Sequence, residues 1–330
     1  MRRLIPIVFL AVLLAQACGL STSQVKHGYE INALVKDEID NLNIKLFDAL
    51  KAGNFSRFRS LLGDSLAEKF RTKTARETWK LISSTAQGRS YDVLDEFYIR
   101  SLIPGSKVTL VSGDGLDEFT YTFRVPARES HVSFITLRDD VSQFLLTVIY
   151  GKFMGKWQVN GLYLDIYSVF GKTAPEYYEK ADDLYLNKFR IDALIAIKTC
   201  NKCRHTSDTF FHYTHQYEID TFSKMLTADV KRKYQLPYTL AKIKSQPRIL
   251  DVAPIIFHKK IVPCVTYLTN TRLDDSMGLK EENKAVQRAV DDLFYGFKHN
   301  NPCIYYRAYN QMPEDKKETP GYDFVELSSQ

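Results

Sequence analysis

The fold is decided by two runs of alternating residues, EFTYTFRV at 118–125 and HVSFITL at 131–137. Successive side chains of a strand point to opposite faces, so this alternation is typical of a strand with one buried face. Two longer runs follow at 144–153 and 157–169. They are rich in β-branched and aromatic residues and are punctuated by glycines. We therefore predict a meander of antiparallel strands in this part of the chain.

The residues before this meander have helical periodicity. From Ile31 to Leu50 apolar side chains recur every three or four residues, and Gly53 follows in the position of a C-cap. Helices followed by a run of strands favour an α+β fold, with helices packed on one face of a curved antiparallel sheet. A curved sheet that is covered on one side forms a cone with an interior pocket. We assign residues 30–171 to this domain.

Two segments at the ends of this domain resemble a known superfamily. LFDALKAGNF at 46–55 is similar to the end of the first helix in the nuclear transport factor two-like (ketosteroid-isomerase-like) superfamily. KWQVNGLYL at 156–164 is similar to its final strand. The resemblance implies a cone-shaped α+β domain. The superfamily contains isomerases, dehydratases and polyketide cyclases as well as domains without catalysis, so the fold implies no single function.

The remaining chain is predicted to form a helical connector and a smaller unit. Apolar periodicity indicates helices within 172–245, including residues 208–234, and one helix pair resembles tetratricopeptide helices without a sustained repeat. Strand-like runs return in residues 246–330, with a predicted helix at 280–298. We expect a small C-terminal α+β domain there.

The first residues have the layout of an export signal. Two arginines precede an apolar run that ends in AQAC at 15–18, which is the order of charge, apolar core and small-residue cleavage site. Ordinary signal peptidase would cleave after this A-x-A site. A bacterial lipobox would instead leave Cys18 diacylated, although Ala15 stands where the lipobox usually has Leu. We predict a signal peptide at 1–17, lipidation of Cys18 and a polar tether at 18–29, with secretion as a soluble protein as the alternative.

The composition excludes several classes of protein. The chain has 45 Lys and Arg against 39 Asp and Glu, a net charge of +6, with 45% hydrophobic and 25% charged residues. These values are ordinary for a globular protein and exclude a disordered or collagen-like chain. The charge is too balanced to favour a nucleic-acid partner, and we expect none. The sequence has no P-loop, GxGxxG, GxSxG or HExxH motif, and we predict no cofactor.

Two cysteines, Cys200 and Cys203, form a CxxC pair near the predicted end of a helix. Two cysteines at this spacing form a disulfide, remain as free thiols or act as a redox centre. Together with His205, His212 and His215 they would form a zinc site. The C-terminal end of a helix opposes a lowered thiol pKa, and the cysteine-histidine spacing fits no zinc finger that we can justify. We therefore predict a disulfide or a thiol pair and no metal.

Catalysis in a cone pocket requires an acid or base that faces inward. Five residues lie on or near the elements that would line this pocket: Asp48, Asp95, Glu96, His131 and Asp165. Alternation alone does not say which of them point into it.

These observations predict an exported, lipid-anchored protein of the bacterial cell envelope that binds or scaffolds without catalysis. Its expected partner is a small hydrophobic ligand or another envelope protein, and it would contact the membrane through its anchor. One alternative is an isomerase-like or hydrolase-like enzyme that uses the cone pocket on a small hydrophobic substrate. A third is a metal or redox protein that acts through Cys200 and Cys203.

Overall fold

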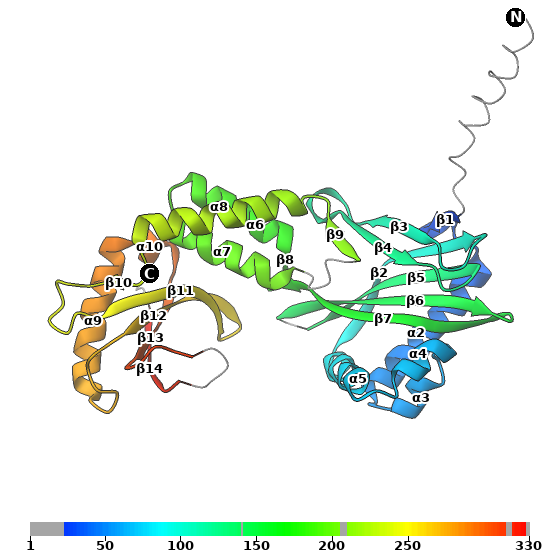
Figure 1. The fold of residues 1–330 in the computed structure, drawn as a ribbon, viewed down its shortest axis with the longest axis horizontal. Helices are drawn as coiled ribbons and strands as arrows, with labels where there is room; N and C mark the ends of the chain where they lie inside the picture. Colours follow the sequence, from blue (N-terminus) through cyan, green and yellow to red (C-terminus); the bar gives the residue numbers. More distant parts are fainter. Residues whose placement is uncertain (1–22, 140, 205–209, 315–318, 328–330) are drawn as a thin grey trace, which may run out of the picture.

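The computed structural model describes residues 23–139, 141–204, 210–314 and 319–327. The predicted signal peptide and Cys18 lie outside these residues. The molecule is elongated: two sheets and their covering helices form one end, a third sheet forms the other, and three helices lie between them (Figure 1). None of the described helices is long and apolar enough to cross a lipid bilayer.

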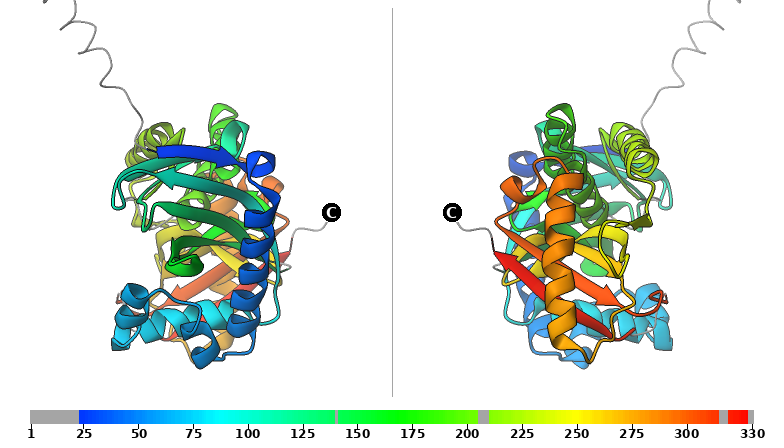
Figure 2. Two further views of the ribbon diagram at one scale, coloured as in Figure 1. Left: turned by 90° about the vertical axis from the view of Figure 1, so that its right-hand side faces the viewer. Right: turned by 90° about the vertical axis from the view of Figure 1, so that its left-hand side faces the viewer.

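The largest sheet, sheet A, has six strands in the order β1-β2-β5-β6-β7-β8. Every pair is antiparallel, as predicted. The register shifts within β2 and at two places along β6 and β7. Such bulges bend a strand and increase its twist, and the sheet is strongly curled (Figure 2). The strands are β1 (Ser23–His27), β2 (Ser90–Ser101), β5 (Glu129–Arg138), β6 (Ser142–Phe153), β7 (Lys156–Val169) and β8 (Lys172–Thr173).

Helices cover one face of sheet A, which confirms the predicted α+β fold class. After the short η1 (Gly28–Glu30), the first long helix begins where the side chain of Asn32 accepts a hydrogen bond from the Leu34 amide at 2.9 Å, and it ends before Gly53, whose φ is +61°. Its apolar stripe packs on the strands that it crosses (Figure 2). The helices are α2 (Ala33–Lys51), α3 (Phe55–Arg59), α4 (Asp64–Lys69) and α5 (Lys73–Ala86).

A second, three-stranded sheet covers the other face of sheet A, so the expectation of a sheet covered on one side only is wrong. Sheet B consists of β3 (Lys107–Ser112), β4 (Phe119–Arg124) and β9 (Phe211–Tyr213), with η2 (Gly115–Asp117) between the first two. The ring of Phe134 in sheet A lies edge-on to the rings of Phe119, at 5.3 Å, and Tyr121, at 5.4 Å, in sheet B. The alternating run at 118–125 therefore belongs to a second layer.

The connector consists of α6 (Ala174–Leu186), α7 (Arg190–Cys203) and α8 (Gln216–Tyr234). The prediction of helix throughout 208–234 is wrong, because β9 precedes α8 and pairs with β4. Helix α6 begins with a capping box between Thr173 and Glu176. Ten of the residues of α7 are buried, since it packs against α6, α8, β7 and β11.

The C-terminal sheet, sheet C, has the order β10-β11-β12-β13-β14. Strands β12 and β13 are parallel, and the long helix α9 makes the crossover between them and lies across the sheet (Figure 2). The helix predicted at 280–298 begins earlier and ends at Leu293, because Gly296 has a φ of +74° and a separate turn follows. The elements are β10 (Tyr238–Thr239), β11 (Arg248–Phe257), β12 (Lys260–Leu268), α9 (Ser276–Leu293), α10 (Phe297–Asn300), β13 (Cys303–Tyr309) and β14 (Gly321–Leu327).

One hydrophobic core runs from sheets A and B through the connector helices into sheet C. A second core lies between sheet A and helices α2 to α5. Two strands of the predicted connector, β8 and β9, pair with strands of the N-terminal sheets. The N-terminal sheets and the connector therefore share both backbone pairing and core.

Candidate functional site

Two of the five candidate acids and bases meet inside the curled sheet, Glu96 of β2 and His131 of β5. His131 Nε2 lies 3.7 Å from Glu96 Oε2, and both side chains are buried. Lys36 of α2 forms an ion pair with the other oxygen of Glu96. Burial, with a smaller contribution from Lys36, lowers the pKa of His131 to about 3. The imidazole is therefore neutral at ordinary pH, and the charged pair is Lys36 with Glu96.

A hydrogen-bonded chain continues from this pair into the core. His131 Nδ1 lies 3.4 Å from Ser133 Oγ, and the Asn43 side-chain amide donates to the same oxygen at 3.5 Å. The Tyr150 hydroxyl donates to Asn43 Oδ1 at 2.7 Å. Each of these residues is at most 4% exposed. The protein's own side chains fill this part of the cone, so the acid and base there have no open access to a substrate.

The other three candidates lie elsewhere. Asp95 follows the bulge in β2 and accepts hydrogen bonds from Ser112 Oγ at 2.6 Å and His27 at 2.5 Å. The carboxylate stands between the serine and the histidine, whereas nucleophilic catalysis needs the histidine in the middle. Asp165 lies near Tyr121 on the side of sheet B. Asp48 is exposed on α2, 4.0 Å from Arg57.

The CxxC pair is a pair of buried thiols at the end of α7. Cys200 and Cys203 are both free and 0% exposed. Burial raises the pKa of each thiol to about 12, so both are protonated at neutral pH and are poor nucleophiles. His205 lies outside the described residues. Among the residues that the structure describes, no group of histidine, cysteine and acidic side chains could hold a metal ion.

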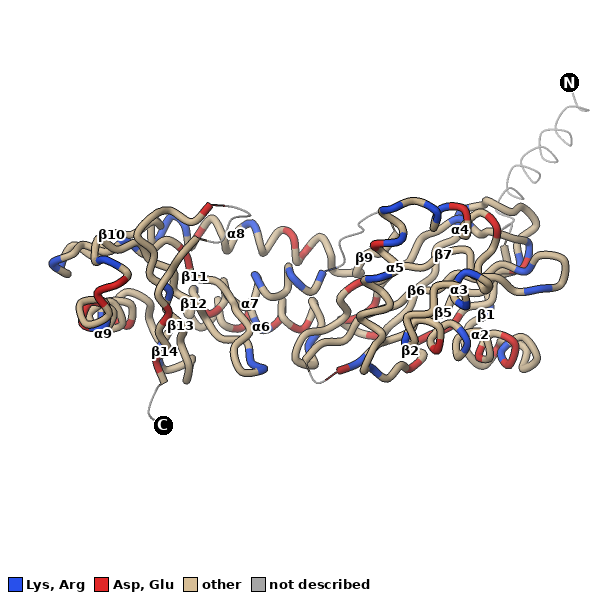
Figure 3. Tube along the Cα trace, turned by 90° about the horizontal axis from the view of Figure 1, so that it is seen from below, with Lys and Arg blue, Asp and Glu red and all other residues tan. Residues whose placement is uncertain are grey.

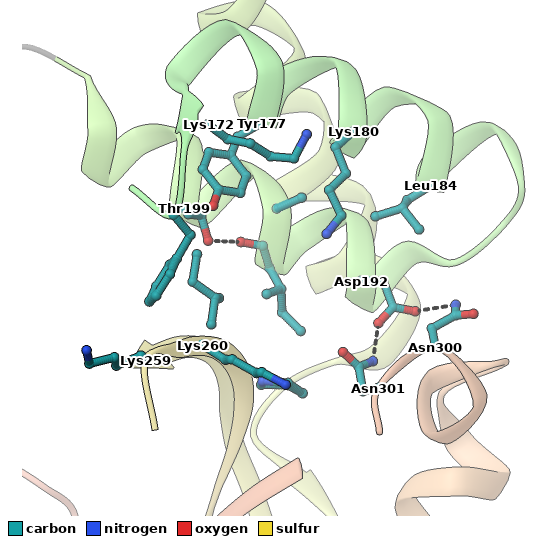
Figure 4. Close-up of a pocket in the computed structure, with 15 residues that line it drawn as sticks. Lys172, Tyr177, Lys180, Leu184, Asp192, Thr199, Lys259, Lys260, Asn300 and Asn301 are labelled. Carbon is teal, nitrogen blue, oxygen red and sulfur yellow. Dashed lines mark hydrogen bonds between the residues drawn. The ribbon is translucent and has the colours of Figure 1, made fainter. Parts of the chain in front are cut away.

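A groove between the helix pair α6–α7 and the hairpin β11–β12 is a better candidate (Figure 4). Its volume is about 310 Å³. Four of its lining residues are lysines that come from separate parts of the chain. They are Lys172 of β8, Lys180 of α6, Lys259 of the hairpin turn and Lys260 of β12. We call this site the lysine groove.

Three of these lysines lack an ion-pair partner in the described part of the chain, although the charge of Lys180 acts on Asp192 and opposes the rise in its pKa that burial causes. Lys172, Lys180 and Lys260 form no ion pair with any described residue. Lys180 and Lys260 reach into the groove from opposite walls (Figure 4). By contrast, Lys198 on the neighbouring surface of α7 donates to both oxygens of Asp251, at 2.7 and 2.9 Å. The groove therefore holds lysines without ion pairs, whereas the charge of Lys198 outside it is neutralised by Asp251.

The acidic residue of the lining, Asp192, is occupied by neighbouring amides. Its two oxygens accept hydrogen bonds from the side chains of Asn300 at 2.9 Å and Asn301 at 2.6 Å. Burial raises the pKa of this carboxyl above its ordinary value. Asp192 thus anchors two amides at one end of the groove, where they add polar groups to the lining (Figure 4).

The hairpin that carries two of the lysines has an unusual turn. His258 and Lys259 have φ values of +45° and +56°. A two-residue turn of this kind favours asparagine and glycine, since other side chains are strained there. Backbone strain of this sort is found often at binding and catalytic sites. Here it fixes the place of Lys259 and Lys260 over the helix pair.

A second pocket lies between sheets A and B. Its volume is about 460 Å³. Most of its apolar lining comes from Phe123, Ile149, Tyr163 and Phe210, and its basic residues are Lys107 and Arg124. This pocket opens on the face opposite to the helix-covered interior that the sequence predicted as the binding site.

No protein-family model, curated protein or solved structure matches this chain. The resemblance to the nuclear transport factor two-like superfamily therefore stays a prediction.

The groove lysines escape sequence analysis because they form no motif. Lys172 and Lys260 are 88 residues apart in the chain, and only the packing of sheet C against α6 and α7 brings them together. The adjacent lysines between two strand-like runs, at 259 and 260, are the one local signal.

Proposed function

We propose that this chain is an exported, lipid-anchored binding protein of the cell envelope that acts without catalysis and takes an anionic ligand in the lysine groove. The observation that carries the proposal is the approach of Lys172, Lys180 and Lys260 to one cavity without an ion pair to any of the described residues. Ammonium groups held close together repel one another, and a bound anion removes this repulsion. A compact ligand with two or more phosphate or carboxylate groups matches the size and charge of the groove.

The absence of catalysis is supported by the state of the reactive groups. The neutral His131 and the paired Glu96 lie in a filled interior, and the thiols of α7 are buried and protonated. The alternative of an isomerase-like or hydrolase-like enzyme lacks an accessible acid or base in the described part of the predicted cone. The export and anchoring of the protein rest on the N-terminal sequence alone.

Calorimetric titration with pyrophosphate and with inorganic phosphate tests the groove. We expect pyrophosphate to bind and the double variant Lys180→Gln/Lys260→Gln to bind at least tenfold more weakly, since a hydrogen bond to a charged group contributes about 1.5–3 kcal/mol. Lys73→Gln, an exposed lysine at the start of α5, serves as the matched control. Equal affinity of the double variant and the control for pyrophosphate would refute the proposal. Mass spectrometry of the mature N-terminus tests the anchor, and an unmodified Cys18 would exclude it.

The pocket between the sheets supports a second binding function. Its walls are aromatic and aliphatic, and Lys107 and Arg124 also line it. This lining suits a small hydrophobic molecule that carries one acidic group. Displacement of a fluorescent fatty acid, compared between the wild-type protein and Phe210→Ala, tests this candidate, and identical displacement curves would count against it.

A further inference from the structure

Exposed apolar side chains gather at one end of sheet A. In the loop that follows β2, Leu102 is 77% exposed and Ile103 is 57% exposed. At the end of β6, Phe153 is 39% exposed, and in the turn that follows Met154 is completely exposed. We call these four residues the apolar tip. A cluster of large exposed apolar residues on two neighbouring loops indicates an interaction surface.

The strand register places both loops at the same end of the sheet. Arg100 at the end of β2 pairs with Glu129 at the start of β5. The next residue of β5, Ser130, pairs with Gly151 near the end of β6. The strands therefore bring the loop after β2 and the turn after β6 to a single edge, which lies at the right of Figure 1.

The segments around the apolar tip are strongly basic. Residues 100–107, 124–129 and 152–156 contain six lysines and arginines and one acidic residue, Glu129. Glu129 is partly buried and accepts a hydrogen bond from the Tyr98 hydroxyl at 2.9 Å. Lysine and arginine positions are visible along the loops at this end (Figure 3). The exposed members of this cationic rim are Arg100, Lys107, Arg124, Arg128 and Lys156.

The chain enters the fold at this same end. Strand β1 begins at Ser23, which pairs with Ser101, and Ser23 Oγ donates a hydrogen bond to Ser101 Oγ at 2.9 Å. Only residues 19–22 separate Ser23 from Cys18. A chain of this length spans at most about 18 Å when fully extended. A lipid on Cys18 would therefore hold the apolar tip within reach of the bilayer surface.

We propose that the apolar tip and its cationic rim dock on the surface of a lipid bilayer that contains anionic phospholipids. The four apolar side chains enter the interfacial region, and the rim binds the negatively charged headgroups. The choice of a bilayer as the occupant rests on the short link to Cys18 and on the sign of the rim, and so on the proposed lipid anchor. A single lipid anchor gains a second attachment from such a surface, and the protein gains a fixed orientation.

Flotation with vesicles tests this proposal without the anchor. The protein used is the processed chain from residue 18 with Cys18→Ser, which carries no acyl group. It is mixed with vesicles of phosphatidylethanolamine and phosphatidylglycerol and, separately, of phosphatidylcholine. We expect flotation with the anionic vesicles, weaker binding at high salt, and about a tenfold lower bound fraction for Ile103→Glu/Met154→Glu. Met277→Glu/Met312→Glu, at exposed sites in α9 and after β13, is the matched control and should float like the parent protein.

The outcomes distinguish a lipid bilayer from a second copy of the chain as the occupant of the apolar tip. Failure of the parent chain to float, or equal flotation of the tip variant and the control, would overturn the proposal. Self-association in sedimentation that the tip variant abolishes would assign the surface to a second copy and would also overturn it. Circular dichroism checks that each variant folds, and the milder Ile103→Ser replaces the double variant if that one does not. Mass spectrometry of Cys18 decides the anchor independently, because flotation of the unlipidated chain reports the tip alone.

Discussion

Acidification should destabilise the N-terminal region through His131. The pKa of this side chain is lowered from 6.5 in the unfolded chain to about 3 in the folded protein, chiefly because the ring is buried. The folded state therefore excludes a proton that the unfolded state binds. This stability is fully present above pH 6.5 and is lost as the pH falls toward the folded pKa. Each unit corresponds to about 1.4 kcal/mol, so the loss reaches about 2 kcal/mol by pH 5.

Urea unfolding followed by tryptophan fluorescence measures this loss. Both tryptophans of the chain, Trp79 and Trp157, pack in or against the core under sheet A, so their emission reports the region that contains His131. The experiment compares the free energy of unfolding at about pH 8 and pH 5 for the wild-type protein, for His131→Gln, and for the exposed control His299→Gln. We expect a pH dependence that is smaller by about 2 kcal/mol in His131→Gln alone. The same pH dependence in all three proteins would refute the assignment of a buried neutral imidazole.

Three further predictions concern the core and the thiols. Phe134→Ala should lower the free energy of unfolding by about 3–5 kcal/mol, since it leaves a cavity between sheets A and B. A loss below about 1 kcal/mol in urea titration would contradict the packing of the two sheets. Tyr150→Phe should lower it by about 1–3 kcal/mol because Asn43 Oδ1 loses its buried donor; an unchanged midpoint would argue against that bond. Cys200 and Cys203 should react with a thiol reagent only after denaturation, and rapid labelling of the native protein would show that they are accessible.

A helix or strand can be predicted from the sequence where its buried residues recur with a single period along the chain. The stripe of α2 can be predicted from the sequence because Ile39, Leu46 and Leu50 recur at helical spacing and meet one core. Asn32 and Gly53 end the pattern for local reasons, a side-chain cap and a positive φ. The strand runs of sheet A can be predicted for the same reason. These elements depend on contacts that each segment makes along one face.

The position of sheet B could not be predicted in this way. The run at 118–125 has one apolar face, but alternation does not identify the surface that this face covers. Phe119 of this run packs on Phe134 of sheet A and on Phe211, which lies 92 residues beyond it in the chain. Phe210 and Phe211 also suit an apolar helix, and pairing with β4 decides that Phe211 is in a strand. Tertiary contact overrides local preference here.

The polar interior of the cone could not be predicted from the sequence for a related reason. His131 and Ser133 occupy what the alternation predicts to be the exposed positions of a strand, but both are buried. Asn43 from α2 donates a hydrogen bond to the Ser133 hydroxyl, which also lies within hydrogen-bond distance of His131 Nδ1. No spacing within one segment predicts such a partnership. The lysine groove could not be predicted either, because its lysines come from elements that meet only in the folded chain.

The two proposed surfaces lie at opposite ends of one strand, and this placement bears on function. Strand β7 begins with Lys156 in the cationic rim and ends at Val169, which pairs with Lys172 in the lysine groove. Its 14 residues span about 45 Å at the usual rise per residue. A tip that docks on the bilayer would therefore hold the groove well away from the lipid. The shared core and the pairing of β9 with β4 join the two ends, so membrane attachment would also orient the groove. Presentation of a binding site at a fixed height and direction requires such rigidity, which the core shared by the sheets and the connector helices provides.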